Sequence, residues 1–140
     1  TEDQMVVIAN PGHELAQKKD VAPKELGNSP PLLFTQETPT RRAIDRFFRK
    51  HSVRPTIVME LDHIATIKHA VEVDIGISIV PLNAIEEEIG RNSLGYLPFN
   101  EKNFVRPLGI LYRKRRSLTV ATQKLLDVLL EGSGQNATEA

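Results

Sequence analysis

The sequence predicts an α/β fold built on a largely parallel β-sheet. Short, mostly apolar segments at residues 5–9, 31–34 and 75–80 are typical of buried strands. Between them lie longer segments with apolar residues at helical spacing, such as Ile44, Phe47 and Phe48. Strands that alternate with helices imply right-handed crossovers between parallel strands.

The first half of the chain contains two of these strands and one clear helix start. Residues 5–9 read as a strand closed by the turn Asn10-Pro11-Gly12, and residues 13–30 as a loop with one or two helical turns. After the strand 31–34, Thr38 is predicted to cap a helix whose first residue is Pro39. This helix is expected to end before Pro55.

The second half continues the alternation. Residues 56–61 alternate between apolar and polar side chains as in a strand. Asp62 is a candidate cap for the next helix, which is expected to have Ile64, Ile67 and Val71 inward. Pro81 is expected to stop the strand 75–80. A short helix over 82–90 and strands over 96–99 and 106–112 follow. Ser117 is predicted to cap a last helix, with these residues inward: Leu118, Ala121, Leu125, Val128 and Leu129.

The block 31–90 supplies three strand–helix units and is complete by itself. The first strand, the last strand and the last helix have no evident partners, so we expect them to belong to a second lobe. The expected organisation is a crossover strand (1–9), a complete lobe (10–97), a return crossover with the C-terminal part of the other lobe (98–131), and a disordered tail (132–140).

Composition excludes several classes of function. Lys plus Arg and Asp plus Glu both number 18, so no net charge draws the chain to nucleic acid or to a membrane surface. The absence of cysteine excludes disulfides, thiolate metal sites and cysteine nucleophiles. No apolar stretch approaches the roughly 18 residues of a spanning helix. Because the chain starts without Met and enters an apolar run almost at once, we expect it to be part of a longer one.

The strongest candidate site is the turn between the strand 31–34 and the helix that starts at Pro39. Helix N-termini beside the carboxyl ends of parallel strands are favourable places for small anions. We expect free N–H groups at Thr40 and Arg41. The candidate ligand-binding residues are Thr35, Gln36, Thr38, Thr40 and Arg41. The alternative, a plain helix cap beside a solvated arginine, is equally consistent with these residues.

Other candidate sites are weaker. The four histidines do not have metal-ligand spacing, and His51 falls on the core stripe of its helix. Glu60, Asp62 and His63 could form an acid/base group, but a helix cap explains them more simply. No nucleophile elbow or glycine-rich phosphate loop is present, so neither an enzyme nor a cofactor is expected. The basic run 113–116 is expected to be a solvated turn.

Several segments together resemble the effector-binding domain of LysR-type transcriptional regulators. They are Leu32-Leu33-Phe34, Thr40-Arg41-Arg42-Ala43-Ile44-Asp45-Arg46-Phe47-Phe48, Val53-Arg54-Pro55, Gly76-Ile77-Ser78-Ile79-Val80-Pro81, the opening residues 6–16 and residues 107–113. The resemblance covers residues 5–131. It implies a fold like type II periplasmic binding proteins, with lobe II complete and lobe I partial, and an effector in the cleft between the lobes.

The resemblance also implies partners. It places the family's lobe II effector contacts on the same turn residues, and the effector is expected to be a small anion or carboxylate. The DNA-binding winged helix and the linker helix would lie upstream, so DNA is contacted only by the full-length protein, a cytoplasmic homodimer or tetramer. The helix over 62–74 is expected to carry the dimer contact. The alternative is a periplasmic solute-binding protein of the same fold.

Overall fold

The computed structural model describes residues 2–101, 104–112 and 118–131. The chain divides into two compact units: Asp3–Arg106 forms one, and Pro107–Ala140 together with Thr1–Glu2 forms the other. None of the helices in the described ranges is long and apolar enough to cross a membrane.

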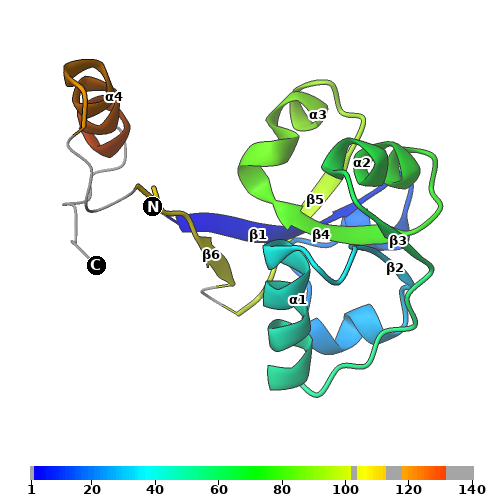
Figure 1. The fold of residues 1–140 in the computed structure, drawn as a ribbon. Helices are drawn as coiled ribbons and strands as arrows, with labels where there is room; N and C mark the ends of the chain where they lie inside the picture. Colours follow the sequence, from blue (N-terminus) through cyan, green and yellow to red (C-terminus); the bar gives the residue numbers. More distant parts are fainter. Residues whose placement is uncertain (1, 102–103, 113–117, 132–140) are drawn as a thin grey trace. The chain divides into compact units, whose positions relative to one another are not determined.

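A mixed six-stranded sheet organises the larger unit (Figure 1), with the order β3-β2-β4-β1-β5 and β6 paired with β1. The strands are β1 (Glu2–Ala9), β2 (Pro31–Phe34), β3 (Met59–Leu61), β4 (Ile77–Pro81), β5 (Gly95–Pro98) and β6 (Val105–Pro107). β2 runs parallel to both β3 and β4. β1 is antiparallel to β4 and β5. The expectation that the first and last strands lack partners is therefore wrong, because β1 lies between two neighbours and β6 pairs with β1.

Helices cover both faces of this sheet. α1 (Pro39–Lys50) connects β2 to β3 on one face, and α2 (Ile64–Glu72) connects β3 back across β2 to β4 on the other (Figure 1). Right-handed crossovers in opposite directions put their helices on opposite faces. α3 (Glu86–Gly90) follows a 3₁₀ turn, Leu82–Ile85, so the expected helix over 82–90 is split in two. The loop after β1 contains the short 3₁₀ helices Glu14–Gln17 and Pro23–Gly27, as expected.

Three sequence expectations need correction. The strand expected over 56–61 is confined to Met59–Leu61, an edge strand paired only with β2, and Met59 is exposed. Asp62 does not cap α2, since the N-cap position is His63 and no side-chain cap bond forms there. The strand expected over 106–112 ends at Pro107. β4 ends at Pro81, the residue predicted to stop it, and Pro81 pairs with Met5 of β1.

The core of the larger unit lies on both sides of the central strands. β2 and β4 are buried along their whole length, as is β1 from Met5 to Ala9. α1 contributes Ile44, Phe47 and Phe48, the stripe predicted from the sequence. Gly76 is required by a close approach, because a Cβ atom there would lie 2.7 Å from the carbonyl oxygen of Pro30.

The smaller unit contains one helix, α4 (Val120–Glu131), within its described residues. Ser117, its predicted cap, and the tail 132–140 lie outside the described residues, and Thr119 Oγ1 accepts from the Thr122 N–H at 3.2 Å instead. None of the residues of α4 is buried in this chain. The inward positions predicted for Leu125, Val128 and Leu129 are exposed by 50% or more.

Candidate functional site

The carboxyl edge of the sheet brings together side chains from distant parts of the sequence. β2 and β4 are parallel and end at this edge with Phe34 and Pro81. β1 runs the opposite way, with Met5 opposite Pro81, so its first residues also lie here. In open α/β sheets, ligands bind outside this edge.

The turn from β2 into α1 is built on the hydroxyl of Thr38. Thr38 Oγ1 accepts from the Arg41 N–H at 3.1 Å and donates to the Thr35 carbonyl at 3.0 Å. Thr38 is thus the N-cap that the sequence predicted, with Pro39 as the first helical residue. The expectation of a free Arg41 N–H is wrong, because this cap uses it.

Arg41 lies inside the structure and is committed to internal partners. Its side chain is only 5% exposed. Nη1 donates to the Phe34 carbonyl and to Glu60 Oε1, both at 2.7 Å, and Nε donates to Asp45 Oδ1 at 2.9 Å. Burial lowers the pKa of the Arg41 guanidinium, but the hydrogen bonds to Glu60 and Asp45 outweigh it and raise the pKa above its ordinary value.

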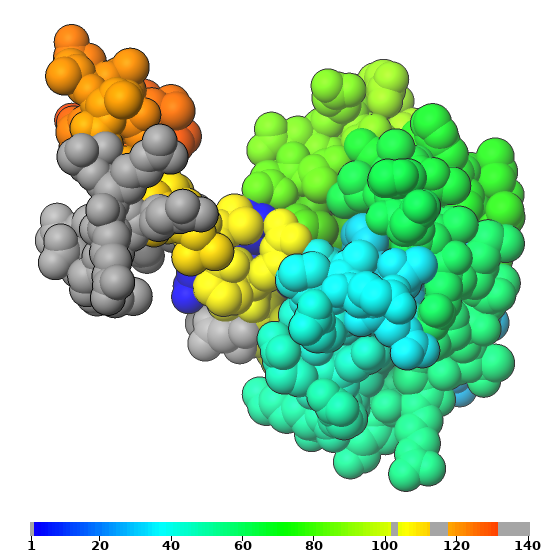
Figure 2. Space-filling view, viewed as in Figure 1, coloured from blue at the N-terminus to red at the C-terminus, as the bar shows by residue number. Residues whose placement is uncertain are grey.

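Sequence reasoning missed a second arginine at the same edge. Arg106 on β6 donates from Nη1 to Thr40 Oγ1 and from Nη2 to Asp3 Oδ2, both at 2.8 Å. Asp3 Oδ1 accepts in turn from Asn83 Nδ2 at 2.6 Å. β6 thus lies directly beside the start of α1 (Figure 2). In the sequence, the only indication of this cluster is that Arg106 lies on the strand predicted over 106–112.

Several donors at the edge stay open. Among the described residues, none accepts a hydrogen bond from the Thr40 N–H, the Thr35 hydroxyl or the amide of Gln36, and Gln36 is exposed. The Nε of Arg106 is buried and has no hydrogen-bond partner in the described chain. Of the five predicted residues, Thr35, Gln36 and Thr40 therefore offer groups to a ligand, while Thr38 and Arg41 shape the turn.

The weaker candidates have structural explanations. Glu60 pairs with Arg41. The side chains of Asp62 and His63 are mostly exposed, and His63 Nε2 lies 3.5 Å from Asp62 Oδ2. His51 packs against Phe47 with ring centroids 4.6 Å apart, as the core stripe predicted. The described residues contain no group of three or more His, Cys, Asp or Glu side chains that could hold a metal ion. The basic run 113–116 lies outside the described residues.

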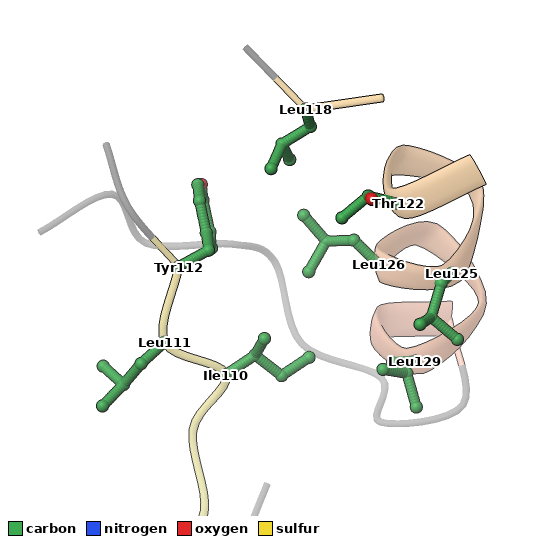
Figure 3. Close-up of a pocket in the computed structure, with 8 residues that line it drawn as sticks. All are labelled: Ile110, Leu111, Tyr112, Leu118, Thr122, Leu125, Leu126 and Leu129. Atoms are coloured by element: carbon green, nitrogen blue, oxygen red, sulfur yellow. The ribbon is translucent and has the colours of Figure 1, made fainter. Parts of the chain in front are cut away.

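A cavity of about 150 Å³ lies within the smaller unit (Figure 3). Its lining is almost entirely aliphatic, and in Figure 3 the side chain of Ile110 points toward α4 while that of Leu111 points away from it. Thr122 and Tyr112 contribute its only hydroxyls among the described lining residues. This composition is typical of an apolar core and does not favour recognition of a charged ligand.

Comparison with known proteins identifies a family that matches almost the whole chain. The LysR substrate binding domain family model matches residues 1–134. The activator CmpR of Synechocystis is 30% identical over 91% of this chain and 42% of its own length. The RuBisCO operon transcriptional regulator of Acidithiobacillus ferrooxidans is 26% identical over 96% of this chain and 44% of its length. The chain thus spans less than half the length of the curated relatives it matches.

Solved structures share the fold. The regulatory domain of Synechocystis CcmR in complex with 2-PG aligns with a TM-score of 0.80 at 27% identity, covering 94% of this chain and 63% of that one. The effector-binding domain of QuiR with shikimate aligns at 0.79 with 22% identity, over 96% of this chain and 63% of that one. These domains have the type II periplasmic-binding-protein-like fold expected from the sequence. The chain belongs to the LysR substrate-binding-domain family, whose members are ligand-sensing regulatory domains of LysR-type regulators and not enzymes.

Proposed function

We propose that this domain senses a small anionic effector, a carboxylate in the first instance, at the turn between β2 and α1. The observation that carries the proposal is the group of open donors at the start of α1: the Thr40 N–H, the Thr35 hydroxyl and the amide of Gln36. The first turn of a helix carries about half a positive charge. An anion placed there gains both that field and hydrogen bonds.

The five residues of the proposed site have different roles. Thr35, Gln36 and Thr40 contact the effector, because their donors or hydroxyls are available. Thr38 holds the turn through its two hydrogen bonds. Arg41 belongs to the site as a positioning residue, since its guanidinium ties the end of β2 to Glu60 of β3.

The complete regulator requires chain beyond these 140 residues. We propose that residues 1–9 are the crossover strand from lobe I and that residues 10–97 form lobe II. Residues 98–131 are then the return crossover and the C-terminal part of lobe I, and the rest of lobe I covers α4. Support comes from the exposed apolar face of α4 and from the 63% coverage of the QuiR and CcmR domains. On this proposal DNA binding belongs to a separate domain of a cytoplasmic homo-oligomer. The family match favours a regulator over a periplasmic solute-binding protein.

Calorimetric titration of the full-length regulator tests the site. The probes are 2-PG, shikimate and benzoate, the ligands of the solved CcmR, QuiR and BenM domains. Thr35→Val removes one hydroxyl, so we expect affinity for the probe that binds to fall about three- to tenfold, or roughly 0.5–1.5 kcal/mol. Gln36→Leu is expected to act in the same direction.

Thr56→Val is the matched control. Thr56 is an exposed threonine that precedes β3, at the opposite edge of the sheet from Thr35. The same change there should leave the affinity as it is. Equal affinities in wild type, Thr35→Val and Gln36→Leu would move the effector site away from this turn.

A further inference from the structure

Two arginines lie at the carboxyl edge, and they differ in the number of carboxylates that each guanidinium contacts. Arg41 has two carboxylates and one carbonyl around a guanidinium that is 5% exposed. Placing an effector carboxylate there would put a third negative group beside a single cation. Like charges in such close contact oppose one another strongly in a buried site. Arg41 is therefore a poor partner for an anion.

Arg106 has one carboxylate partner, and that partner is shared. Asp3 uses one oxygen for Arg106 and the other for the amide of Asn83. The side chain of Arg106 is 27% exposed, so a ligand can reach it. Its Nη1 contacts Thr40, the residue whose backbone N–H is open at the start of α1.

The Nε of Arg106 adds an independent observation. It is buried, and no described residue accepts its hydrogen. A buried N–H without an acceptor is unfavourable, so an oxygen atom of a ligand that reached it would stabilise it. The planar guanidinium presents neighbouring donors in a fixed fork that matches the two oxygens of a carboxylate.

We propose that Arg106, on the strand that leaves the larger unit, supplies the positive charge that an anionic effector meets at this site. Arg41 positions the turn without touching the effector. The inference rests on the proposed function and adds the residue that decides between a charged and a neutral ligand. Asp3 moderates that charge.

Paired probes that differ only in charge test this assignment. The full-length regulator is titrated with benzoate and benzamide and with shikimate and its primary amide, and the ratio of the two Kd values within each pair is the readout. Wild type should prefer the carboxylate. The double substitution Arg106→Gln with Asp3→Asn keeps the net charge and leaves no carboxylate unpaired. We expect it to weaken carboxylate binding at least tenfold and to leave amide binding unchanged.

Two further variants separate recognition of charge from a structural role. Asp3→Asn alone frees Arg106 from its counter-ion, so carboxylate affinity should rise. A purely structural pair predicts the reverse, a fall for both probes. Arg41→Gln should weaken carboxylate and amide by the same factor, because it loosens the turn. Arg106→Lys retains the charge and should keep most of the carboxylate preference.

The outcomes distinguish this inference from the proposed function. A carboxylate-to-amide ratio that is unchanged in the double variant, with Thr35→Val still weakening both probes, overturns the role of Arg106 and leaves the site in place. If Thr35→Val and the double variant both leave binding unchanged, the site itself is wrong. If neither carboxylate probe binds, the proposed ligand class and the role of Arg106 are both wrong. Circular dichroism melts confirm that each variant is folded.

Discussion

The two units of this chain use similar sequence patterns with opposite results. α1 has an apolar stripe, and Ile44, Phe47 and Phe48 on it are buried against the sheet. α4 is just as long and richer in leucine, yet Leu125, Val128 and Leu129 are exposed by half or more. Amphipathic spacing identifies the apolar face of a helix. That face is buried only where another element, such as the sheet beneath α1, packs against it.

The two units also differ in the kinds of side chain that they bring together. The larger unit holds charged and polar groups at a sheet edge beside a helix start, which is a setting for recognition of an anion. The smaller unit holds an aliphatic cavity. We expect substitutions in the larger unit to change folding and ligand binding. On the proposal that the rest of lobe I covers α4, substitutions on the exposed face of α4 should act on that assembly.

The largest expected effect comes from paired core truncations. Ile79 is fully buried in β4, so Ile79→Ala should lower the free energy of unfolding of the larger unit by about 2–5 kcal/mol. Leu125→Ala in this chain should change it by less than about 0.5 kcal/mol. Urea denaturation followed by circular dichroism measures both. Equal losses would mean that α4 is part of the same cooperative core.

A smaller effect is expected at the ion pair between α2 and α3. Glu88 is buried and pairs with Lys68 Nζ at 2.8 Å, and Lys68 also donates to the Ala84 carbonyl. Glu88→Gln weakens this contact, so unfolding at pH 7 should become easier by about 1–3 kcal/mol. Arg91 is exposed and should contribute little, which makes Arg91→Gln the control.

The pH dependence of the same pair has a defined sign. The hydrogen bond from Lys68 holds the pKa of Glu88 below its ordinary value of 4.5, although burial raises it. A carboxylate with a lowered folded-state pKa contributes stability above pH 4.5 and loses it as the pH falls through the folded value. Wild type should therefore lose stability more steeply than Glu88→Gln below about pH 4.5. If wild type and Glu88→Gln lose stability in parallel as the pH falls, protonation of Glu88 is not linked to folding.

The smallest expected effect compares two threonine caps. Thr38 Oγ1 caps α1 at 3.1 Å, and Thr119 Oγ1 caps α4 at 3.2 Å. Thr38→Ala should lower the unfolding free energy of the larger unit by about 1 kcal/mol. Thr119→Ala should leave that unit unchanged and raise only the amide exchange rates at the start of α4. A loss of global stability in Thr119→Ala would contradict the comparison.

Much of the fold follows from the sequence because its signals are local. The strand over 31–34, the Thr38 cap and the stripe of α1 depend on residues within a few positions of one another. The errors in strand length have a common cause. The expected strands over 56–61 and 106–112 are shorter in the structure, because their length depends on the neighbours they pair with. Asp62 failed as a cap because α2 begins one residue later.

For the candidate site, the sequence by itself determined the β2–α1 turn, its cap and the family, since these are written in contiguous residues. The tertiary structure decided which groups are open. It turned Arg41 inward to Glu60 and brought Arg106 to Asp3 and Thr40. Contacts between residues so far apart in the chain arise from strand order, with β1 antiparallel to β4 and β6 beside β1. No local pattern of residues specifies that order.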